Sequence, residues 1–393
     1  MSEWKEYRLG EVSTVQTGPF GSQLHQSDYK LIGTPIITVE HLGENKILHQ
    51  DIPLVSNEDK ERLNKYVLAE GDIVFSRVGS VDRRAYVSKN EDGWMFSGRC
   101  LRVRVNKEIV DPKYLSYYFG QESFKEHIRM IAVGATMPSI NTEILSGVGL
   151  NLPDLPEQRS IASIFSSLDD KIDLLHRQNK TLEALAETLF RQWFKEEAEE
   201  GWVTGKFGDI ADINPTYQLK KGDISPYLEM SNVSTSTFNP EGWYEREFSS
   251  GMKFKNGDTL IARITPCLEN GKTCYVTFLD EEEIGWGSTE YIVIRMKKPF
   301  HPFISYIMAK DKDFRDFAVS SMSGSSGRQR AQADVIKEYD VIIPPLEIIK
   351  ELNLQLAGIT PKLEKNAKQI RTLTRLRDTL LPKLMSGEVR VAV

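Results

Sequence analysis

The feature that most constrains this chain of 393 residues is an internal repeat. The stretch GDIVFSR, from Gly71 to Arg77, returns 186 positions later as GDTLIAR, from Gly257 to Arg263. The stretch LPDLPEQ, from Leu152, returns 191 positions later as IPPLEII. Self-similarity that keeps its order over such distances predicts two copies of one structural plan. The two halves run roughly over residues 1–200 and 201–393.

Each half ends in a segment whose apolar residues alternate four and three positions apart, the pattern of a coiled-coil helix. Both segments carry one asparagine in this pattern, and the second segment follows the first by 191 positions. At 1.5 Å per residue, each helix is on the order of 55 Å long. The positions that define this helix-pair seam are Ile161, Phe165, Leu168, Ile172, Leu175, Asn179, Leu182 and Leu189 in the first helix, and Leu352, Leu356, Ile359, Leu363, Asn366, Ile370, Leu373 and Leu380 in the second.

Opposite charges favour packing of these two helices against each other. Residues 157–200 carry a net charge of −4, and residues 347–388 carry +3. A strand-rich region separates the helices in sequence, so an antiparallel pair is the expected geometry. Two separate, solvated helices are the alternative. Pro382 is expected to kink or end the second helix, because proline cannot donate a backbone hydrogen bond.

The expected fold class is therefore α+β, with an internal tandem repeat in a pseudo-two-fold arrangement. Residues 1–155 form the first strand-rich domain and residues 156–200 the first long helix. Residues 201–344 form the second strand-rich domain, and residues 345–393 form the second long helix and a C-terminal tail.

Composition narrows the class of protein. The chain is 40% hydrophobic and 27% charged, which is typical of a globular protein. It has no apolar run long enough for a membrane helix and no secretory signal, so no membrane partner is expected. Three cysteines fit a reducing compartment, and a cytoplasmic location is expected. The net charge of −6 argues only weakly against nucleic acid, since it can hide local basic patches.

Signatures of catalysis are missing from the sequence. It has no phosphate-binding loop, no H-E-x-x-H and no G-x-S-x-G, and its six histidines show no ligand spacing. One loose nuclease-like pattern consists of Asp154, Asp169 and Lys171. Helical rise separates Asp154 from Asp169 by roughly 20 Å, so they cannot share a metal ion. The sequence predicts a non-catalytic protein with no metal site.

Polar loops and one basic stretch are candidates for binding. The loops GPFGSQL, from Gly18, and SGSSGRQRAQ, from Ser323, combine glycine and serine with amide or guanidinium groups. Such groups can meet phosphates and base edges, but ordinary turns have the same composition. The stretch from Arg77 to Arg104 contains seven basic residues and three acidic ones. This stretch fits either phosphate contact or a solvated strand face.

The Gly-Asp repeat has a structural interpretation. Its second copy replaces Ser76 by Ala262, so a shared active site is improbable. Gly71 and Asp72 are expected to form a turn into a core strand. Arg77 and Arg263 are then either phosphate clamps or partners of ion pairs that hold the fold.

With these features together, the chain resembles the specificity subunit of type I restriction–modification enzymes. The resemblance covers nearly the whole length. It is carried by the doubled GDIVFSR/GDTLIAR, the doubled YLSYYF/FISYIM, the LPDLPEQ before the first helix and the ending LRDTLLPKLMSGEV. No single motif is decisive, but their order, twice over, is specific.

The resemblance implies a non-catalytic subunit in which two target-recognition domains each read one half of a split double-stranded DNA sequence. The helices form a conserved spacer that sets the gap and docks two methyltransferase subunits. Those partners, with a restriction and translocase subunit, carry S-adenosylmethionine, ATP and Mg; this chain needs no cofactor. The second helix entry lacks the Glu-Gln pair of the first, which is expected to make the two docking surfaces less equivalent.

The resemblance also directs the choice of DNA-binding residues. The candidates are Ser22, Gln23, Ser76, Arg77, Arg83, Arg84 and Arg99 in the first domain, and Lys253, Arg263, Lys272, Arg328, Gln329 and Arg330 in the second. Three alternatives stay open: a specificity subunit that serves a methyltransferase-only complex, a coiled-coil scaffold with two binding domains that do not bind DNA, and an enzyme with an unrecognised site.

Overall fold

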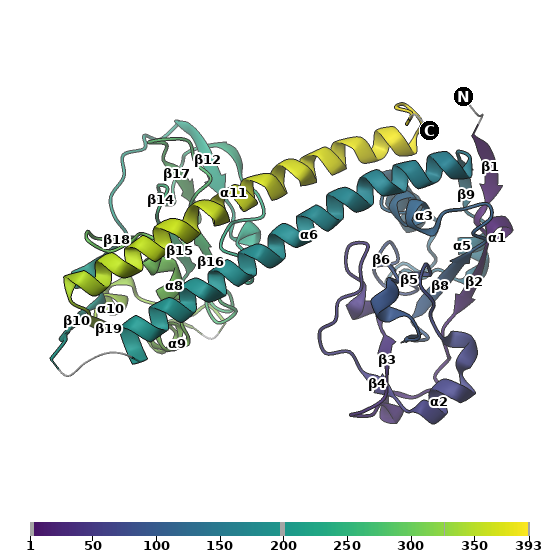
Figure 1. Cartoon of the computed structure of the whole chain (residues 1–393), viewed down its shortest axis with the longest axis horizontal. Coiled ribbons are helices and arrows are strands. Elements are labelled where there is room, and N and C mark those ends of the chain that lie inside the picture. Colours follow the sequence, from purple (N-terminus) through teal and green to yellow (C-terminus); the bar gives the residue numbers. More distant parts are fainter. Residues whose placement is uncertain (1–3, 197–200, 326, 392–393) are drawn as a thin grey trace. The chain divides into compact units, whose positions relative to one another are not determined.

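The computed structural model describes residues 4–196, 201–325 and 327–391. The chain divides into two compact units (Figure 1). Unit 1 consists of Met1–Lys171 and Leu373–Val393, and unit 2 of Ile172–Thr372. Each unit therefore contains one strand-rich copy and a segment of each long helix.

Unit 1 contains two main sheets, one four-stranded with the order β2-β8-β5-β6 and one three-stranded with the order β4-β3-β7; β1 and β9 form a separate antiparallel pair. Its strands are β1 (Lys5–Arg8), β2 (Ser13–Thr17), β3 (Thr34–Ile37), β4 (Leu54–Val55), β5 (Ile73–Ser76), β6 (Arg84–Tyr86), β7 (Met95–Phe96), β8 (Cys100–Val105) and β9 (Gly149–Leu152). Its short helices are α1 (Leu9–Val12), α2 (Asn57–Arg62), α3 (Pro112–Tyr118), α4 (Glu122–Ile131) and α5 (Thr142–Ser146).

Unit 2 follows the same plan, with four-stranded sheets in the orders β11-β18-β15-β16 and β13-β12-β17-β14 and an antiparallel pair of β10 and β19. Its strands are β10 (Val203–Lys206), β11 (Ala211–Ile213), β12 (Ile224–Leu228), β13 (Tyr244–Glu247), β14 (Met252–Phe254), β15 (Thr259–Ala262), β16 (Thr273–Tyr275), β17 (Gly285–Gly287), β18 (Tyr291–Met296) and β19 (Asp340–Ile343). Its short helices are α7 (Phe207–Ile210), α8 (Ile304–Lys310), α9 (Lys312–Ser320) and α10 (Ala333–Ile336).

Strand register shows that the two copies correspond residue by residue. In unit 1 β3 runs parallel to β7, with Ile36 opposite Met95. In unit 2 β12 runs parallel to β17, with Tyr227 opposite Trp286, and both of these residues lie 191 positions after their counterparts. The predicted α+β tandem repeat is confirmed.

A buried aspartate of the Gly-Asp repeat forms an ion pair in each unit. Both carboxylate oxygens of Asp72 accept hydrogen bonds from Arg104, from Nε and Nη2 at 2.7 Å each. Oδ1 of Asp258 lies 2.7 Å from Nε of Arg295, the residue 191 positions after Arg104. Both aspartates are almost completely buried. The pairs explain why both halves keep this residue, and they remove Arg104 from the suggested basic strand face.

The glycine before each aspartate is required by the turn. Gly71 has a φ of +96° and Gly257 a φ of +86°, a region that side chains rarely adopt. Each aspartate also accepts the backbone N–H of the residue three positions before it, at 2.8 Å. The interpretation of Gly-Asp as a structural turn into a core strand agrees with this geometry.

The two long helices are α6 (Leu155–Arg191), which a π-helical turn continues to Glu196, and α11 (Leu346–Met385). In unit 1, Asp169 of α6 lies 3.0 Å from Arg377, and Glu157 lies 2.5 Å from Arg390 beyond the end of α11. The second pair lies earlier in α6 and later in the chain, so the predicted antiparallel pairing is confirmed. Pro382 does not end α11, because the helix continues to Met385 and buries both Leu384 and Met385.

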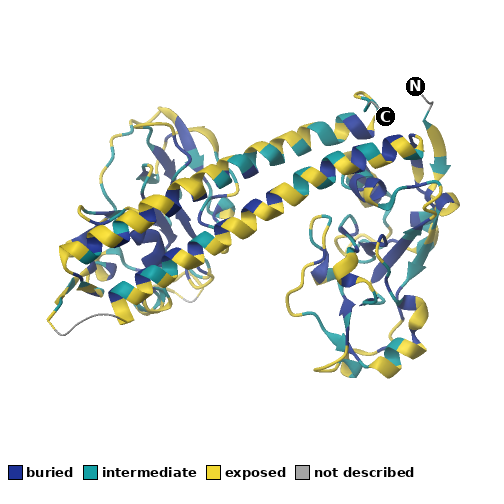
Figure 2. Cartoon of the chain, viewed as in Figure 1, coloured by how far each residue is buried: buried dark blue, intermediate teal, exposed yellow. Residues whose placement is uncertain are grey.

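The helix-pair seam faces inward along both helices (Figure 2). Its asparagines meet inside unit 2, where Nδ2 of Asn366 donates to Oδ1 of Asn179 at 2.9 Å. A paired buried amide satisfies two polar groups at once and disfavours other registers. Seam residues that are buried are Ile161, Phe165, Ile172, Leu175, Asn179, Leu352, Leu356, Ile359, Leu363 and Ile370, and those that are half-buried are Leu168, Leu182, Leu189, Asn366, Leu373 and Leu380.

The Glu-Gln pair at the start of α6 lies inside unit 1. Glu157 is 3% exposed, and its carboxylate accepts hydrogen bonds from Arg390 at 2.5 and 2.6 Å. Gln158 accepts the backbone N–H of Asp111 at 2.9 Å and donates to the carbonyl of Ile109 at 3.1 Å. The polar atoms of this pair join the helix to its own unit, so the residues that differ between the two helix entries are buried and make internal contacts.

Unit 2 makes the same connection with a different residue. Oδ1 of Asn353 accepts the backbone N–H of His301 at 2.9 Å, and Nδ2 donates to the carbonyl of Pro299 at 2.6 Å. His301 and Pro299 lie 190 positions after Asp111 and Ile109, two of the three backbone partners of Gln158; the third is the carbonyl of Pro153 at 2.9 Å. Asn353 lies one helical turn beyond Ile349, the residue 191 positions after Gln158. The amide has therefore moved by a turn while two of its backbone partners have stayed.

Candidate nucleic-acid interface

The strand of the Gly-Asp repeat leads in each unit to an arginine that is held between two other segments. The backbone N–H of Arg77 donates to the carbonyl of Arg99 at 2.8 Å, and its carbonyl accepts from Ile140 at 2.9 Å. Arg263 makes the same two bonds, at 2.9 and 2.8 Å, to the residues 191 positions beyond those partners. The loops that follow Arg77 and Arg263 therefore begin at equivalent positions in the two copies of the fold.

A hairpin precedes the second of these partners in both units, over residues 133–139 in unit 1 and over the described residues 323–325 and 327–330 in unit 2. The end residues of each hairpin are joined through their backbones. The second residue is a glycine with positive φ, +108° at Gly134 and +128° at Gly324. Sequence reasoning selected the second hairpin and missed the first, although these glycines lie 190 positions apart and mark the correspondence.

Each hairpin is bonded to the loop that follows the repeated strand. In unit 1, Gly79 donates its backbone N–H to the carbonyl of Pro138 at 2.8 Å. In unit 2, Thr265 does the same to Gln329 at 3.1 Å. We call these segments the paired loops: 78–83 with 133–139 in unit 1, and 264–272 with 323–330 in unit 2.

The paired loops of unit 2 present an arginine and a glutamine to solvent. Arg328 and Gln329 are both exposed. Arg330 is instead held by Glu290, with contacts from 2.6 to 3.0 Å between its guanidinium and the carboxylate, and this ion pair raises the pKa of Arg330. Of the three predicted residues in this hairpin, two are accessible to a ligand and one is occupied by an internal ion pair.

In unit 1, two glycines bring two loops together at the same end of the repeated strand. A Cβ added to Gly18 would lie 2.1 Å from the carbonyl oxygen of Ser97, and one added to Gly98 would lie 2.2 Å from that of Pro19. Such distances exclude any side chain, so residues 18–23 and 97–99 pack backbone against backbone. This packing places the exposed Ser22 and Arg99 on neighbouring loops.

The side chain of Arg77 lies beside the same loops. Its Nη1 donates to the carbonyl of Gly98 at 3.0 Å, and its guanidinium lies 5.6 Å from the centre of the Phe20 ring. Arg77 and Arg263 are both half-buried. Nε of Arg263 is buried, and no partner for it lies among the described residues. Arg77 thus has a role in holding the loops, and Arg263 retains unsatisfied donor capacity.

Two predicted DNA-binding residues lie in the core, and that prediction was wrong. Ser76 is fully buried at the end of β5, and its hydroxyl donates to the carbonyl of Val78 at 2.9 Å. Arg84 is 3% exposed; it donates to the carbonyl of Ser116 at 3.2 Å and forms an ion pair with Glu44 at 2.8 Å. Both side chains are enclosed by their own unit.

Four more predicted side chains are half-buried and make hydrogen bonds inside their own unit. Three of the four are arginine or lysine side chains that donate hydrogen bonds to backbone carbonyls. These N–H groups are then not available to a phosphate. The pairs are Gln23 with the Tyr66 hydroxyl at 2.9 Å, Arg83 with the carbonyl of Leu42, Lys253 with the carbonyls of Tyr217 and Leu219 at 3.1 Å each, and Lys272 with the carbonyl of Met230 at 2.8 Å.

The acids of the loose nuclease pattern have structural roles. Oδ1 of Asp154 accepts the backbone N–H of Glu157 at 3.1 Å, which caps the start of α6. Asp169 accepts from the Tyr117 hydroxyl at 2.7 Å and from Arg377. Among the described residues, no group of three His, Cys, Asp or Glu side chains could hold a metal ion. No helix in the described part of the chain is long and apolar enough to cross a bilayer.

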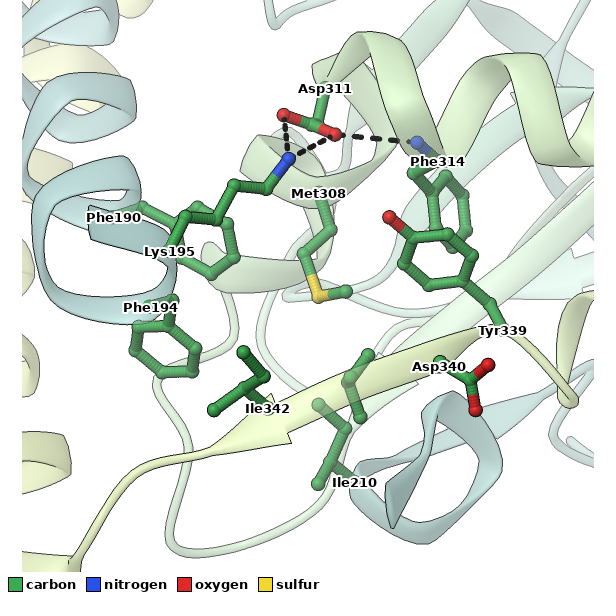
Figure 3. Close-up of a pocket in the computed structure, with 11 residues that line it drawn as sticks. Phe190, Phe194, Lys195, Ile210, Met308, Asp311, Phe314, Tyr339, Asp340 and Ile342 are labelled. Carbon is green, nitrogen blue, oxygen red and sulfur yellow. Dashed lines mark hydrogen bonds and ion pairs between the residues drawn. The ribbon is translucent and has the colours of Figure 1, made fainter. Parts of the chain in front are cut away.

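Unit 2 also contains a small pocket, of about 120 Å³, between the end of α6, α9 and β19 (Figure 3). Phe190, Phe194 and Met308 supply apolar walls. Lys195 at its edge donates to both oxygens of Asp311 at 2.9 Å. Lys195 pairs with Asp311, and Asp340 pairs with Lys206 at 2.8 Å. Because these charged groups have partners and the walls are apolar, the pocket has the composition of a packing defect.

Comparison with known proteins agrees with this duplicated design. The family described as "Type I restriction modification DNA specificity domain" matches residues 1–184 and again residues 199–377. The two matches coincide with the two copies of the fold.

Individual relatives and a solved structure extend the comparison over the whole chain. The type I restriction enzyme HindI specificity subunit of Haemophilus influenzae is 24% identical over 468 residues, which cover 99% of this chain and 100% of the relative. The MjaIX specificity subunit of Methanocaldococcus jannaschii is 25% identical over 313 residues, 73% of this chain and 71% of the relative. A type I restriction–modification S subunit from M. genitalium shares the fold with a TM-score of 0.61 at 16% identity, covering 97% of this chain and 96% of that one. With its doubled match and the doubled fold, this chain belongs to the family of type I restriction–modification DNA specificity domains.

Proposed function

We propose that this chain is the DNA-specificity subunit of a type I restriction–modification complex, in which units 1 and 2 each read one half of a bipartite target in double-stranded DNA. The observation that carries the proposal is the repetition of one surface device. Each unit joins the loop after its Gly-Asp strand to a glycine hairpin by equivalent backbone bonds. Two copies of the paired loops in one chain fit a DNA target that has two parts.

The exposed residues of these loops have the chemistry for reading bases. Arginine pairs with guanine and glutamine with adenine through two hydrogen bonds each, so Arg328 and Gln329 are the base-reading candidates of unit 2. In unit 1 the candidates are Ser22 and Arg99, which lie on the neighbouring loops 18–23 and 97–99 and not on the paired loops. Arg77 and Arg263 lie at the edges of these surfaces, where a phosphate contact would fix the register without selecting sequence.

The partners of this chain follow from the same proposal. Two methyltransferase subunits would dock on the long helices and supply S-adenosylmethionine chemistry, and a restriction and translocase subunit would use ATP and Mg. The strand-rich regions, residues 1–156 and 201–346, each carry a net charge of −3. Because phosphate neutralisation supplies much of the affinity for DNA, the partners would provide most of the basic contacts.

A pair of matched variants tests the assignment of each half-site to one unit. The assembled complex is expressed in cells, and methylated sites across the genome are mapped. Arg328→Ala with Gln329→Ala should relax one half of the target, since each lost bidentate contact weakens discrimination by about 1–3 kcal/mol. Ser22→Ala with Arg99→Ala should relax only the other half. A target with no second half, or relaxation of the same half by both variants, would contradict the proposal.

The helices give a second test, because they are proposed to act as a ruler. One heptad is inserted after Lys180 in α6 and one before Lys365 in α11, so that the seam stays in phase. Seven residues add about 10 Å of helix, which corresponds to roughly three base pairs. The mapped target should keep both half-sites and gain that many unread positions. The same heptad in α6 alone should abolish methylation, because it breaks the pairing; changed half-site bases in the double insertion would rule out the ruler.

A further inference from the structure

The hairpin of unit 1 carries apolar side chains on its exposed side. Val133 is 63% exposed and Met137 is 65% exposed, and Ala135 and Thr136 between them are exposed as well. No exposed side chain of the paired loops of unit 1, residues 78–83 and 133–139, is charged. We call residues 133–137 the apolar tip. It offers a ligand methyl and thioether groups and one hydroxyl.

The charged residues of the paired loops of unit 1 have partners inside the unit. Asp82 forms an ion pair with Arg129 at 2.6 Å. Arg83 donates a hydrogen bond to the carbonyl of Leu42. Asp82 and Arg83 are both half-buried. Because both charges are engaged, the side chains that remain available to a ligand on these loops are mainly those of the apolar tip.

Hydrogen bonds anchor the apolar tip in the candidate interface. The backbone N–H of Gly79, in the loop that follows the repeated strand, donates to the carbonyl of Pro138 at 2.8 Å. Val133 and Ser139 exchange two backbone hydrogen bonds, at 2.9 and 2.8 Å. Both ends of the tip are therefore fixed, so that Val133 and Met137 are presented with little backbone freedom left to lose on binding.

The hairpin of unit 2 keeps this backbone connection and changes the side chains. The hydrogen bond that Pro138 accepts from Gly79 is the one that Gln329 accepts from Thr265, so Arg328 stands in the place of Met137. A partner protein bound in two identical copies would meet both hairpins with one surface and would require similar side chains on both. Unlike side chains on a retained backbone fit a ligand whose two halves differ, and the bipartite DNA of the proposed function is such a ligand.

The major groove of DNA can accommodate both kinds of hairpin. Guanine and adenine present the hydrogen-bonding edges that suit Arg328 and Gln329. Thymine presents a methyl group in the same groove, and apolar side chains contact that group. Neither Val133 nor Met137 has a hydrogen-bond donor in its side chain. The apolar tip therefore matches a thymine methyl group better than it matches any hydrogen-bonding base edge.

We propose that Val133 and Met137 are specificity-determining residues of unit 1, which select thymine by contact with its methyl group in the major groove. This inference deepens the proposed function and rests on it, because it requires the paired loops of unit 1 to face DNA. At the equivalent position of unit 2, Arg328 would select its base by hydrogen bonds. The two hairpins would then read their half-sites by different chemistry from the same place in the fold.

The test uses the complex with its methyltransferase subunits and duplexes that carry the mapped bipartite site. The half-site of unit 1 is the one that the Arg328 and Gln329 variant leaves intact. Deoxyuridine replaces each thymine of this half-site and its complement in turn, which removes the methyl group and keeps base pairing. At one or two positions the replacement should weaken binding by wild type about fourfold, the loss expected for one buried methyl group. Val133→Ala with Met137→Ala should bind thymine and deoxyuridine duplexes equally at those positions.

Arg328→Ala is the matched control, because it truncates the equivalent residue of the other hairpin. It should weaken binding and keep the fourfold effect of deoxyuridine. Both substituted side chains of the unit 1 variant are exposed, so the variant should fold normally. A half-site of unit 1 without thymine, or a deoxyuridine effect that persists undiminished in the Val133 and Met137 variant, would overturn the inference.

Loss of methyltransferase subunits from that variant on gel filtration would also overturn it, because the apolar tip would then be a protein-docking surface. If the wild-type complex bound mapped and scrambled duplexes equally, the proposed function itself would fail.

Discussion

Replacing Asp258 by asparagine is expected to destabilise unit 2 by about 3 kcal/mol, because the change leaves Arg295 without its charged partner. Asp258 is completely buried and accepts from the Tyr217 hydroxyl at 3.1 Å as well as from Arg295 at 2.7 Å. Burial raises the pKa of Asp258 to about 6, and the Arg295 guanidinium opposes that rise, so the carboxylate is ionised at pH 7. Part of the Arg295 side chain reaches water, which keeps the expected loss at the lower end for a buried pair.

Urea unfolding of the full chain, with hydrogen exchange to locate the loss, measures this effect. Asp258→Asn together with Arg295→Met should recover much of the stability, since removing both partners leaves no unpaired charge. Asp334→Asn is the matched control, because it neutralises an exposed carboxylate in the same unit and should leave the unfolding midpoint unchanged. Equal losses in Asp258→Asn and in the double variant would show that the unpaired Arg295 charge is not the cause of the loss.

The architecture of this protein could be predicted from sequence because its signals are periodic or repeated. The seam depends on spacing alone; that its two asparagines, Asn179 and Asn366, pair at 2.9 Å is a finding of the structure. The second copy of the Gly-Asp turn, at Gly257, was enough to exclude a shared active site, because Ala262 replaces Ser76 there. Such patterns report on backbone geometry, and backbone geometry is what both copies retain.

The candidate site was harder to predict because exposure depends on which surfaces pack together. The strand β5 supplies Ile73 and Phe75 to one apolar core and Val74 to another. A strand covered on both faces buries polar residues as well, so Ser76 lies in the interior. The three consecutive apolar residues before Ser76 are typical of such a strand, and they were the available signal. Arg84 is buried because its guanidinium bonds to groups on distant segments, which no local pattern reveals.

The replacement of the Gln158 amide by that of Asn353 was also hidden from sequence comparison. Gln158 and Asn353 join a helix to equivalent backbone atoms, yet they are not equivalent positions in the repeat. Sequence comparison aligned Gln158 with Ile349 and indicated a loss. The amide that joins the helix to its domain lies one helical turn later in unit 2, at Asn353. A shift of one turn keeps a side chain on the same face of the helix. Only the bonded atoms identify the replacement.

Glu183 gives unit 2 a pH dependence that sequence did not suggest. This side chain of α6 is 7% exposed, and its carboxyl accepts from the Tyr306 hydroxyl at 2.7 Å. Burial raises its pKa from 4.5 to about 7; the hydrogen bond from Tyr306 and the charge of Lys310 oppose the rise, and Glu187 adds to it. Folded unit 2 therefore keeps a proton on Glu183 at pH values where the unfolded chain has already lost it.

Stability should consequently fall as the pH rises from 4.5 to about 7. The raised pKa contributes stability that is fully present below the unfolded value and lost as the pH passes the folded value. The difference of about 2.5 pH units between the pKa values of 4.5 and about 7 corresponds to about 3 kcal/mol. Glu183→Gln cannot titrate and should still accept from Tyr306, so its free energy of unfolding should gain about that amount relative to wild type across this window and stay parallel above it. Urea unfolding at half-unit pH steps measures the difference, with Glu269→Gln as the control, because Glu269 is an exposed carboxylate of the same unit. A constant difference from pH 4.5 to 7.5 would mean that Glu183 is ionised in the folded protein throughout this window.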